Sequence, residues 1–366
     1  MHILQLLSST AYHGAEAMVA ELTRQLHHQG ARVDIAVLDN AGRGDAQIFQ
    51  EVAEAASATH VIPCNGRLDL DTLRALKNIK ASRKIDVVHS HKYKTTFYAA
   101  LARTKDTALI TTYHNWLYDT RALRAYAWVD KKLARLNELC VGVSTPVTHE
   151  LRRHVPASRV LQIDNGIDTA RYTPSLTRAA AKAALGRAPD RPLVGFVGRL
   201  SVEKGLPHLI NALGGVQPAD FDALIVGDGD LRAPITEQVQ AAGLSGRVSL
   251  LGNRRDTPAI YAAVDVFVLP SLQEAFPMVV LEAMAAGCAV VATSVGEVGR
   301  ILRHGVDGLI VPPGDPLALR EAITTLLRDP AMRSSLGSAA QLRVGSSFSS
   351  ASMARAYLLA CERAMA

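Results

Sequence analysis

Two glutamates with seven residues between them lie in the segment Glu274–Gly287, EAFPMVVLEAMAAG. The apolar run Val266–Leu269 before them predicts a buried strand, and Pro277 suits the first turn of a helix because its missing N–H needs no intrahelical acceptor. The amides that follow can then bind an anion, helped by the helix dipole. Glu274 and Glu282 could face one cleft and accept hydrogen bonds from ligand hydroxyls. Taken alone, such a pair is more often one solvated and one capping glutamate.

Two cations follow another predicted strand, Leu193–Val197. Arg199 and Lys204 stand in GFVGRLSVEKG, on a loop that leads into a helix. The planar fork of arginine and the point charge of lysine both suit a diphosphate whose negative charge grows as it departs. In isolation, two surface cations would be the simpler explanation. Beside the glutamate motif, the pair predicts a phosphate-binding loop.

Polar residues also follow strands in the N-terminal half. Gly14 lies in a turn between a predicted strand, His2–Leu7, and a helix from about 15 to 28, and a lone glycine in such a turn is common. His114 follows the strand-like run 108–111 and could donate a hydrogen bond to a ligand hydroxyl. A single histidine near a strand end is otherwise more often structural.

A framework of alternating strands and helices would position these residues, and the sequence predicts two such series. Strands are predicted at 2–7, 33–38, 86–89, 108–111 and 138–143, and again at 193–197, 223–226, 248–250, 266–269 and 289–292. Two successive series of this kind predict an α/β fold of two Rossmann-like domains, with the junction in 165–190. We place the domains at 1–168 and 169–349, and 350–366 as a helix that could pack back on the first.

Bulk properties agree with two soluble domains. The chain has 366 residues, 48% of them hydrophobic and 20% charged, which is typical of a globular protein. The start lacks the pattern of a signal peptide, and no apolar run reaches the ~20 residues of a membrane span, so we expect a cytoplasmic protein. Four scattered cysteines without CxxC spacing predict buried reduced thiols rather than a zinc site or disulfide.

The positive charge is concentrated in one stretch. Arg67–Arg135 holds fifteen Lys or Arg and six Asp, a net +9, whereas the whole chain carries +6. Such a stretch can attract anionic lipid, phosphorylated substrates or nucleic acid, or can be an ordinary solvated face. It has no recognisable recognition helix or stacking platform, which disfavours nucleic acid. No G-x-G-x-x-G follows the first strand, which disfavours a dinucleotide oxidoreductase.

Together these motifs resemble the large retaining glycosyltransferase family 4, whose members have the GT-B architecture of two Rossmann-like domains facing across a cleft. Glu274–Gly287 is similar to the family's E-x-F-P-x4-E-A-M-A-x-G signature. The resemblance implies that Glu274 contacts hydroxyls of the transferred sugar and that Glu282 holds the ribose of the nucleotide. It places near the diphosphate the donor-binding residues Phe276, Pro277, Met278 and Val279.

The resemblance assigns further roles. Arg199 and Lys204 correspond to the two cations that stabilise the departing nucleoside diphosphate. His114 matches a histidine that faces the donor sugar, and Gly14 matches a glycine loop beside the donor phosphates. That loop usually has two adjacent glycines, and here His13 occupies the first place.

One further loop departs from the family pattern, and another carries a D-x-D pattern. Gly296–Arg300 corresponds to the family's Gly-Gly-x-Pro-Glu, so that Arg300 replaces the glutamate; this reflects either donor or acceptor choice or a shifted loop. Asp228 and Asp230 form a D-x-D pattern, which holds a divalent metal in other glycosyltransferases. Because the pattern follows a strand directly and lies between glycines, it predicts a turn here, and we expect no metal site.

The implied function is a retaining glycosyltransferase that needs neither metal nor another cofactor. Its donor is expected to be a nucleotide-sugar, with UDP favoured over GDP. Front-side attack assisted by the leaving phosphate is the mechanism that the family implies. Alternatives are a non-catalytic nucleotide-sugar-binding or scaffold protein, or an epimerase or phosphorylase of the same architecture.

The acceptor is expected on the N-terminal domain, where aromatic residues lie among the basic ones. Basic and aromatic side chains together suit an anionic membrane surface. We therefore expect a glycan or lipid-linked acceptor of cell-surface polysaccharide or lipopolysaccharide synthesis, with peripheral docking on the inner face of the cytoplasmic membrane. The aromatic residues concerned are Tyr113, Trp116, Tyr118, Tyr126 and Trp128.

Overall fold

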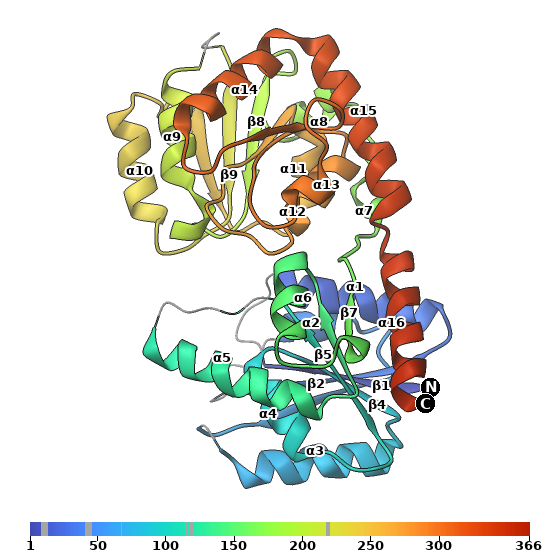
Figure 1. Ribbon diagram of the computed structural model, residues 1–366. Helices are drawn as coiled ribbons and strands as arrows, with labels where there is room; N and C mark the ends of the chain where they lie inside the picture. The colour runs from blue at the N-terminus through green and yellow to red at the C-terminus, as the bar shows by residue number, and fades with distance from the viewer. Residues whose placement is uncertain (9–13, 41–45, 67, 115, 117–119, 217–219) are drawn as a thin grey trace. The chain divides into compact units, whose positions relative to one another are not determined.

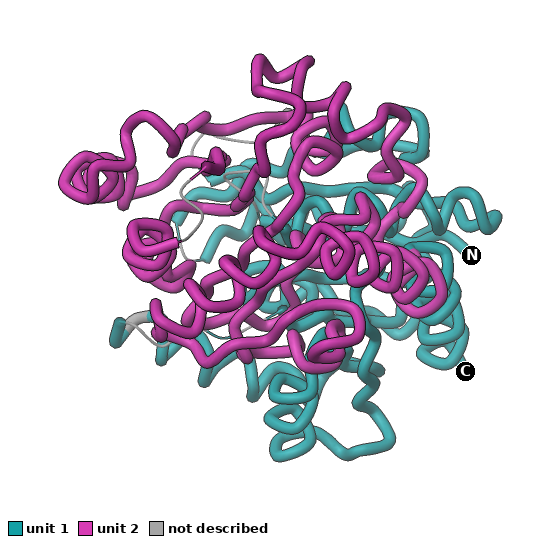
Figure 2. The backbone as a smooth tube through the Cα atoms, turned by 90° about the horizontal axis from the view of Figure 1, so that it is seen from above, with its two compact units in different colours: residues 1–166, 350–366 teal, residues 167–349 magenta. Residues whose placement is uncertain are grey.

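The computed structural model describes residues 1–8, 14–40, 46–66, 68–114, 116, 120–216 and 220–366. These residues form two compact units (Figures 1 and 2): unit 1 is 1–166 with 350–366, and unit 2 is 167–349. The chain therefore passes from one unit to the other twice, once after Gly166 and once after Ser349.

Unit 1 is built on a parallel sheet with the strand order β3-β2-β1-β4-β5-β6-β7. Its strands are β1 (His2–Leu7), β2 (Arg32–Asp39), β3 (Ala58–Pro63), β4 (Val87–His91), β5 (Ala108–Tyr113), β6 (Leu139–Gly142) and β7 (Val160–Gln162). The order reverses between β1 and β4. In open α/β sheets this switch point leaves a crevice at the carboxyl ends of the two strands, where ligands bind.

Helices cover both faces of this sheet (Figure 1). They are α1 (Gly14–His28), α2 (Ala46–Glu51), α3 (Leu70–Arg83), α4 (Tyr93–Leu101), α5 (Arg121–Leu133), α6 (Thr145–Arg152) and α16 (Ser350–Met365). Side chains alternate along each strand, so Ile3 and Val33 pack with α1 and α16. Leu4 and Ala36 pack with α3 and α4 on the other face. The last helix of the chain thus completes unit 1.

Unit 2 repeats the plan with the order β10-β9-β8-β11-β12-β13. Its strands are β8 (Leu193–Val197), β9 (Asp222–Val226), β10 (Val248–Gly252), β11 (Val266–Leu269), β12 (Ala289–Thr293) and β13 (Leu309–Val311). Its helices are α7 (Thr169–Tyr172), α8 (Arg178–Ala184), α9 (Leu206–Gly214), α10 (Arg232–Ala241), α11 (Thr257–Ala263), α12 (Met278–Ala285), α13 (Val298–Ile301), α14 (Pro316–Arg328) and α15 (Pro330–Ser347). Here the strand order reverses between β8 and β11.

The predicted fold class of two Rossmann-like α/β domains is confirmed. The units divide between Gly166 and Ile167, and most of the segment 165–190 folds as part of unit 2, where α7 packs beside α12 and α8 beside α11.

The four cysteines are buried and free. In the described part of the chain, no helix combines the length and apolar character that a membrane span requires.

Candidate functional site

Lys204 and Glu274 meet at the switch point of unit 2. Lys204 ends the short 3-10 turn after β8, and Glu274 lies on the loop after the adjacent strand β11. Lys204 Nζ donates to Glu274 Oε1 at 2.5 Å, and Ser271 Oγ donates to the same oxygen at 2.8 Å. The two side chains are 20% and 10% exposed. They therefore form a polar pair that a ligand in the crevice could reach.

Backbone contacts hold these two loops together. The N–H of Leu272 donates to the carbonyl of Glu203 at 2.8 Å. Gly205 has a φ of 63°, and a Cβ there would lie 2.1 Å from the carbonyl oxygen of Pro270. Glycine is required both for the left-handed backbone and for this close approach. The position of Lys204 is thus set by its neighbour Gly205.

Arg199, the other predicted cation, lies at the start of the same loop. Its guanidinium forms an ion pair with Glu203, and its side chain is 56% exposed. Exposed ion pairs contribute little to stability. The guanidinium can therefore turn toward an anionic ligand at small cost.

The predicted anion-binding helix, α12, begins at Met278, as the sequence indicated, and Pro277 precedes its first turn rather than lying in it. Pro277 is the N-cap, with an extended backbone. The N–H groups of Met278 and Val279 belong to the first turn, where no intrahelical acceptor is available, so they can face an anion. Phe276 is buried and meets Phe348 edge-on, with 6.1 Å between ring centroids. Its buried side chain anchors the loop that precedes α12.

Glu282 on α12 is held by two tyrosines that sequence analysis did not identify. The hydroxyl of Tyr261 on α11 donates to Glu282 Oε2 at 2.8 Å, and the Tyr172 hydroxyl also bonds to this carboxyl. Burial raises the pKa of Glu282, and the tyrosine hydrogen bonds offset part of this effect. The carboxyl group is therefore fixed in orientation, as recognition of ligand hydroxyls requires.

The loop Gly296–Arg300, which departs from the family pattern, packs on the backbone of Glu274. Gly296 has a φ of 51°, and a Cβ there would lie 2.3 Å from the Glu274 carbonyl oxygen. Glu297 is 2% exposed, donates its N–H to the carbonyl of Ala275 at 3.0 Å, and pairs with Arg300 at 3.1 Å. The loop therefore keeps its glycine contact, and Arg300 serves as the partner of Glu297.

The predicted turn at the D-x-D pattern is present. Gly227 and Gly229 both have positive φ, and the side chain of Asp228 accepts the N–H of Gly229 at 2.8 Å and pairs with Arg232 at 3.3 Å. Across the described ranges, no group of three or more His, Cys, Asp or Glu could hold a metal ion.

In unit 1, His114 follows β5 and is partly exposed, while Gly14 begins α1 at an exposed position with open space where a Cβ would lie. The structure brings His114 to His91 at the end of β4, with 3.4 Å between His114 Nε2 and His91 Nδ1. His13 and Tyr118 lie outside the described residues. Lys92, with a φ of 77°, pairs with the buried Glu16 of α1. A non-glycine residue with this backbone often marks a functional site.

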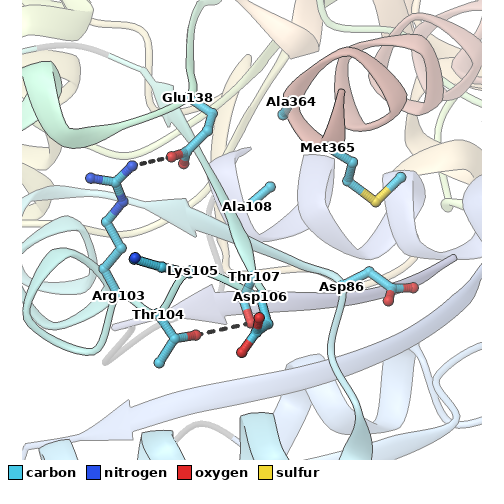
Figure 3. A pocket seen from close by; sticks show the side chains of 10 residues that line it. All are labelled: Asp86, Arg103, Thr104, Lys105, Asp106, Thr107, Ala108, Glu138, Ala364 and Met365. Atoms are coloured by element: carbon cyan, nitrogen blue, oxygen red, sulfur yellow. Dashed lines mark hydrogen bonds and ion pairs between the residues drawn. The ribbon is translucent and has the colours of Figure 1, made fainter.

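A cavity of about 730 Å³ in unit 1 lies at the opposite edge of the sheet, before β4, β5 and β6 (Figure 3). Two of its three carboxylates, Asp86 and Glu138, are already engaged in contacts that hold the sheet together. Asp86 accepts the N–H of His2 at 2.7 Å, and Glu138 accepts that of Leu109 at 2.8 Å and pairs with Arg103. We therefore do not assign the reaction to this cavity.

The fold and the polar edge of unit 2 define the class: the protein is a glycosyltransferase of the GT-B type. The chain belongs to glycosyltransferase family 4. The models described as Glycosyltransferase Family 4 and Glycosyl transferases group 1 match residues 12–171 and 191–329.

Individual relatives agree with this assignment. An uncharacterized glycosyltransferase of Methanocaldococcus jannaschii, MJ1607, is 30% identical in an alignment 266 positions long that covers 67% of each chain. The lipopolysaccharide core biosynthesis mannosyltransferase LpsB of Rhizobium meliloti is 33% identical over 45% of this chain and 50% of its own. A solved structure of Anabaena Alr3699/HepE with UDP shares the fold, with a TM-score of 0.85, 24% identity, and coverage of 98% of this chain and 99% of that one.

Proposed function

We propose that the protein transfers a sugar from a UDP-sugar to a glycan or lipid-linked acceptor, with retention of anomeric configuration and without a metal ion. The observation that carries this proposal is the Lys204–Glu274 pair at the switch point of unit 2, with Glu282 and the first turn of α12 on the same loop and helix. One edge of one sheet thus presents groups for a phosphate, for sugar hydroxyls and for a ribose.

Each group has a distinct task in the proposed reaction. Glu282 accepts hydrogen bonds from the ribose, and the amides of Met278 and Val279 bind the diphosphate. Lys204 and Arg199 stabilise the negative charge that develops on the departing phosphate, a task that metal ions perform in other enzymes. Glu274 binds hydroxyls of the transferred sugar. UDP is supported as the nucleotide because solved structures of the same fold hold UDP and UDP-glucose.

The chemical step replaces one bond to the anomeric carbon by another on the same face. The bond from this carbon to the phosphate oxygen breaks, and its electron pair leaves with UDP. The acceptor oxygen forms the new glycosidic bond, and its proton passes to the departing phosphate oxygen. Lys204 and Arg199 favour this step because they bind the leaving diphosphate more strongly than the intact donor.

The acceptor side is proposed to be unit 1, acting at the cytoplasmic face of a membrane. Ala127 and Asp130 of α5 face inward, whereas Trp128 is 64% exposed with Lys132 Nζ 5.7 Å from its ring centroid. Basic and aromatic side chains in this arrangement suit the headgroup region of an anionic bilayer. Tyr113 and Trp116, which were expected among the aromatic residues of this surface, are instead buried. The residues exposed on α5 and just beyond it are Arg121, Arg124, Ala125, Tyr126, Trp128, Val129, Lys132, Arg135 and Leu136.

A lipid-linked acceptor fits this surface, and the relative LpsB is named for lipopolysaccharide core biosynthesis. The test is to incubate the protein with labelled UDP- and GDP-sugars and bacterial lipid extracts in EDTA, and to determine the product anomer by NMR. An α-linked product from an α-linked UDP-sugar is expected. An inverted product, a requirement for Mg²⁺, or donor turnover without any acceptor, as an epimerase would show, would each contradict the proposal.

A further inference from the structure

Three histidines of unit 1 form an array at the ends of β4 and β5. His89 and His91 lie on one face of β4, with 4.2 Å between their ring centroids, and His91 and His114 follow at 5.7 Å. His89 and His91 are 1% and 0% exposed, whereas His114 is partly exposed. The array therefore connects the interior of the sheet to its carboxyl edge.

All three imidazoles are neutral near pH 7. Burial lowers the pKa of His89 to about 3 and that of His114 to about 4, and it lowers the pKa of His91 well below its ordinary value. The nearby Lys92 lowers the pKa of His114 further, and Glu16 opposes this effect. A neutral imidazole has one N–H and one lone pair, so each ring can donate at only one nitrogen.

The side chain of Gln5 on β1 determines which nitrogen of each neighbouring imidazole carries the proton. Gln5 Oε1 lies 2.8 Å from His91 Nε2; with the amide in this orientation its oxygen accepts, which assigns the proton of His91 to Nε2. His91 Nδ1 then carries a lone pair and accepts from His114 Nε2 at 3.4 Å. The proton of His114 is consequently on Nε2, and its lone pair is on Nδ1.

We propose that Gln5 and His91 are positioning residues that hold His114 in the Nε2–H tautomer, so that Nδ1 accepts a hydrogen bond from a hydroxyl of the bound sugar. This inference rests on the proposed function. It reverses the donor role that the sequence suggested for His114. It also gives a reason for two polar side chains, Gln5 and His91, in the fully buried centre of the sheet.

The protonation of His114 can be observed directly. The full chain labelled with ¹⁵N-histidine is studied by long-range ¹H–¹⁵N NMR at pH 7, with His114 assigned by comparison with His114→Ala. Nε2 is expected to resonate as a protonated nitrogen and Nδ1 as a lone-pair nitrogen. Saturating UDP-glucose should move the Nδ1 resonance toward the protonated range. A proton on Nδ1, or no movement of the Nδ1 resonance when UDP-glucose is bound, overturns the proposal.

Gln5→Met tests the positioning role because methionine has a similar shape but lacks the carbonyl acceptor. The variant should show both tautomers of His114 in comparable amounts. Thr112→Val is the matched control: it removes a buried hydroxyl that bonds to His89 at 2.7 Å, outside the path from Gln5 to His114. An unchanged tautomer in Gln5→Met contradicts the proposal. UDP binding to the wild type tests the proposed function separately, and its absence would contradict that function while the tautomer result stands.

Discussion

Lys204 and Glu274, 70 positions apart in the chain, form an ion pair of 2.5 Å across the switch point of unit 2. The proposed function assigns them to different parts of the donor, the phosphate and the sugar. In the structure the two charges neutralise each other. An unpaired charge at this partly buried position would lower the free energy of unfolding. Binding of the donor must exchange this mutual contact for two contacts with ligand.

Lys204→Ala should therefore reduce kcat by about 10²- to 10³-fold, the usual effect of removing one fixed group that stabilises developing charge. The Tm should fall only slightly, because Glu274 loses its ion-pair partner but keeps the hydrogen bond from Ser271. Steady-state transfer assays and thermal melts measure the two quantities. Arg74→Ala is the control, since its pair with Asp71 on α3 is largely exposed. A kcat equal to that of the wild type would exclude the assigned role of Lys204.

Tyr261→Phe should weaken UDP binding by about tenfold, the effect of one hydrogen bond to a charged group. The phenyl ring keeps its packing against Phe267, at 5.6 Å between ring centroids, while Glu282 loses one of the two tyrosine hydrogen bonds that orient it. Calorimetric titration with UDP and 2′-deoxy-UDP separates the effects: the preference of the wild type for UDP should shrink in the variant. Tyr98→Phe in unit 1 is the control. An unchanged preference would show that Glu282 does not bind the ribose.

Asp34 on β2 should make unit 1 sensitive to acid. Burial raises the pKa of this carboxyl, but hydrogen bonds from Arg83, His2 and His60 outweigh burial and hold the pKa well below its ordinary range. Because the folded pKa lies below the unfolded value of about 3.9, the stabilisation is present above that pH and is lost as the pH falls further.

Asp34→Asn should lower the free energy of unfolding by about 3 kcal/mol at pH 7, because it leaves Arg83 without its partner. It should also flatten the decline of stability below pH 4. Urea unfolding followed by tryptophan fluorescence reports on unit 1 alone, because Trp116 and Trp128 both lie there. Asp71→Asn, at an exposed carboxylate, is the control. Parallel stability curves for Asp34→Asn and the wild type would contradict the account.

Lys132→Glu should reduce binding to phosphatidylglycerol vesicles at low salt by more than tenfold, since each basic residue near an anionic surface contributes about 1 kcal/mol and the substitution changes two charges. Trp128→Ala should have a smaller effect. Co-sedimentation measures both, with neutral phosphatidylcholine vesicles for comparison. Leu342→Ala, which removes an exposed leucine from unit 2, should behave like the wild type. Equal sedimentation of Lys132→Glu and the wild type would argue against docking through α5.

The sequence predicted the central strands well and the edges poorly. β8 and β11 are apolar runs buried between helices, so their signal is continuous. β3 was not predicted, because it is an edge strand whose residues alternate in exposure and which ends in a proline. β13 has only three residues, too few for a periodic signal.

The candidate site could be predicted where residues of suitable chemistry lie at a recognisable spacing within one short segment. Glu274 and Glu282 lie with a helix start in a single motif, and Lys204 precedes a glycine that its loop requires. The supporting contacts were not predictable, because Tyr261 reaches Glu282 only through the packing of α11 beside α12. The same holds for Gln5, which reads as an interruption in an apolar strand until β4 is placed beside β1.

The central claim is that the edge of unit 2 binds a nucleoside diphosphate sugar without metal. Thermal-shift measurements with UDP-, GDP-, ADP- and CMP-sugars in EDTA, on the wild type and on Glu282→Ala, test it most directly. The account predicts a rise in Tm with UDP-sugars in the wild type and little or none in Glu282→Ala. No shift with any nucleotide-sugar, or an equal shift in both proteins, would contradict it.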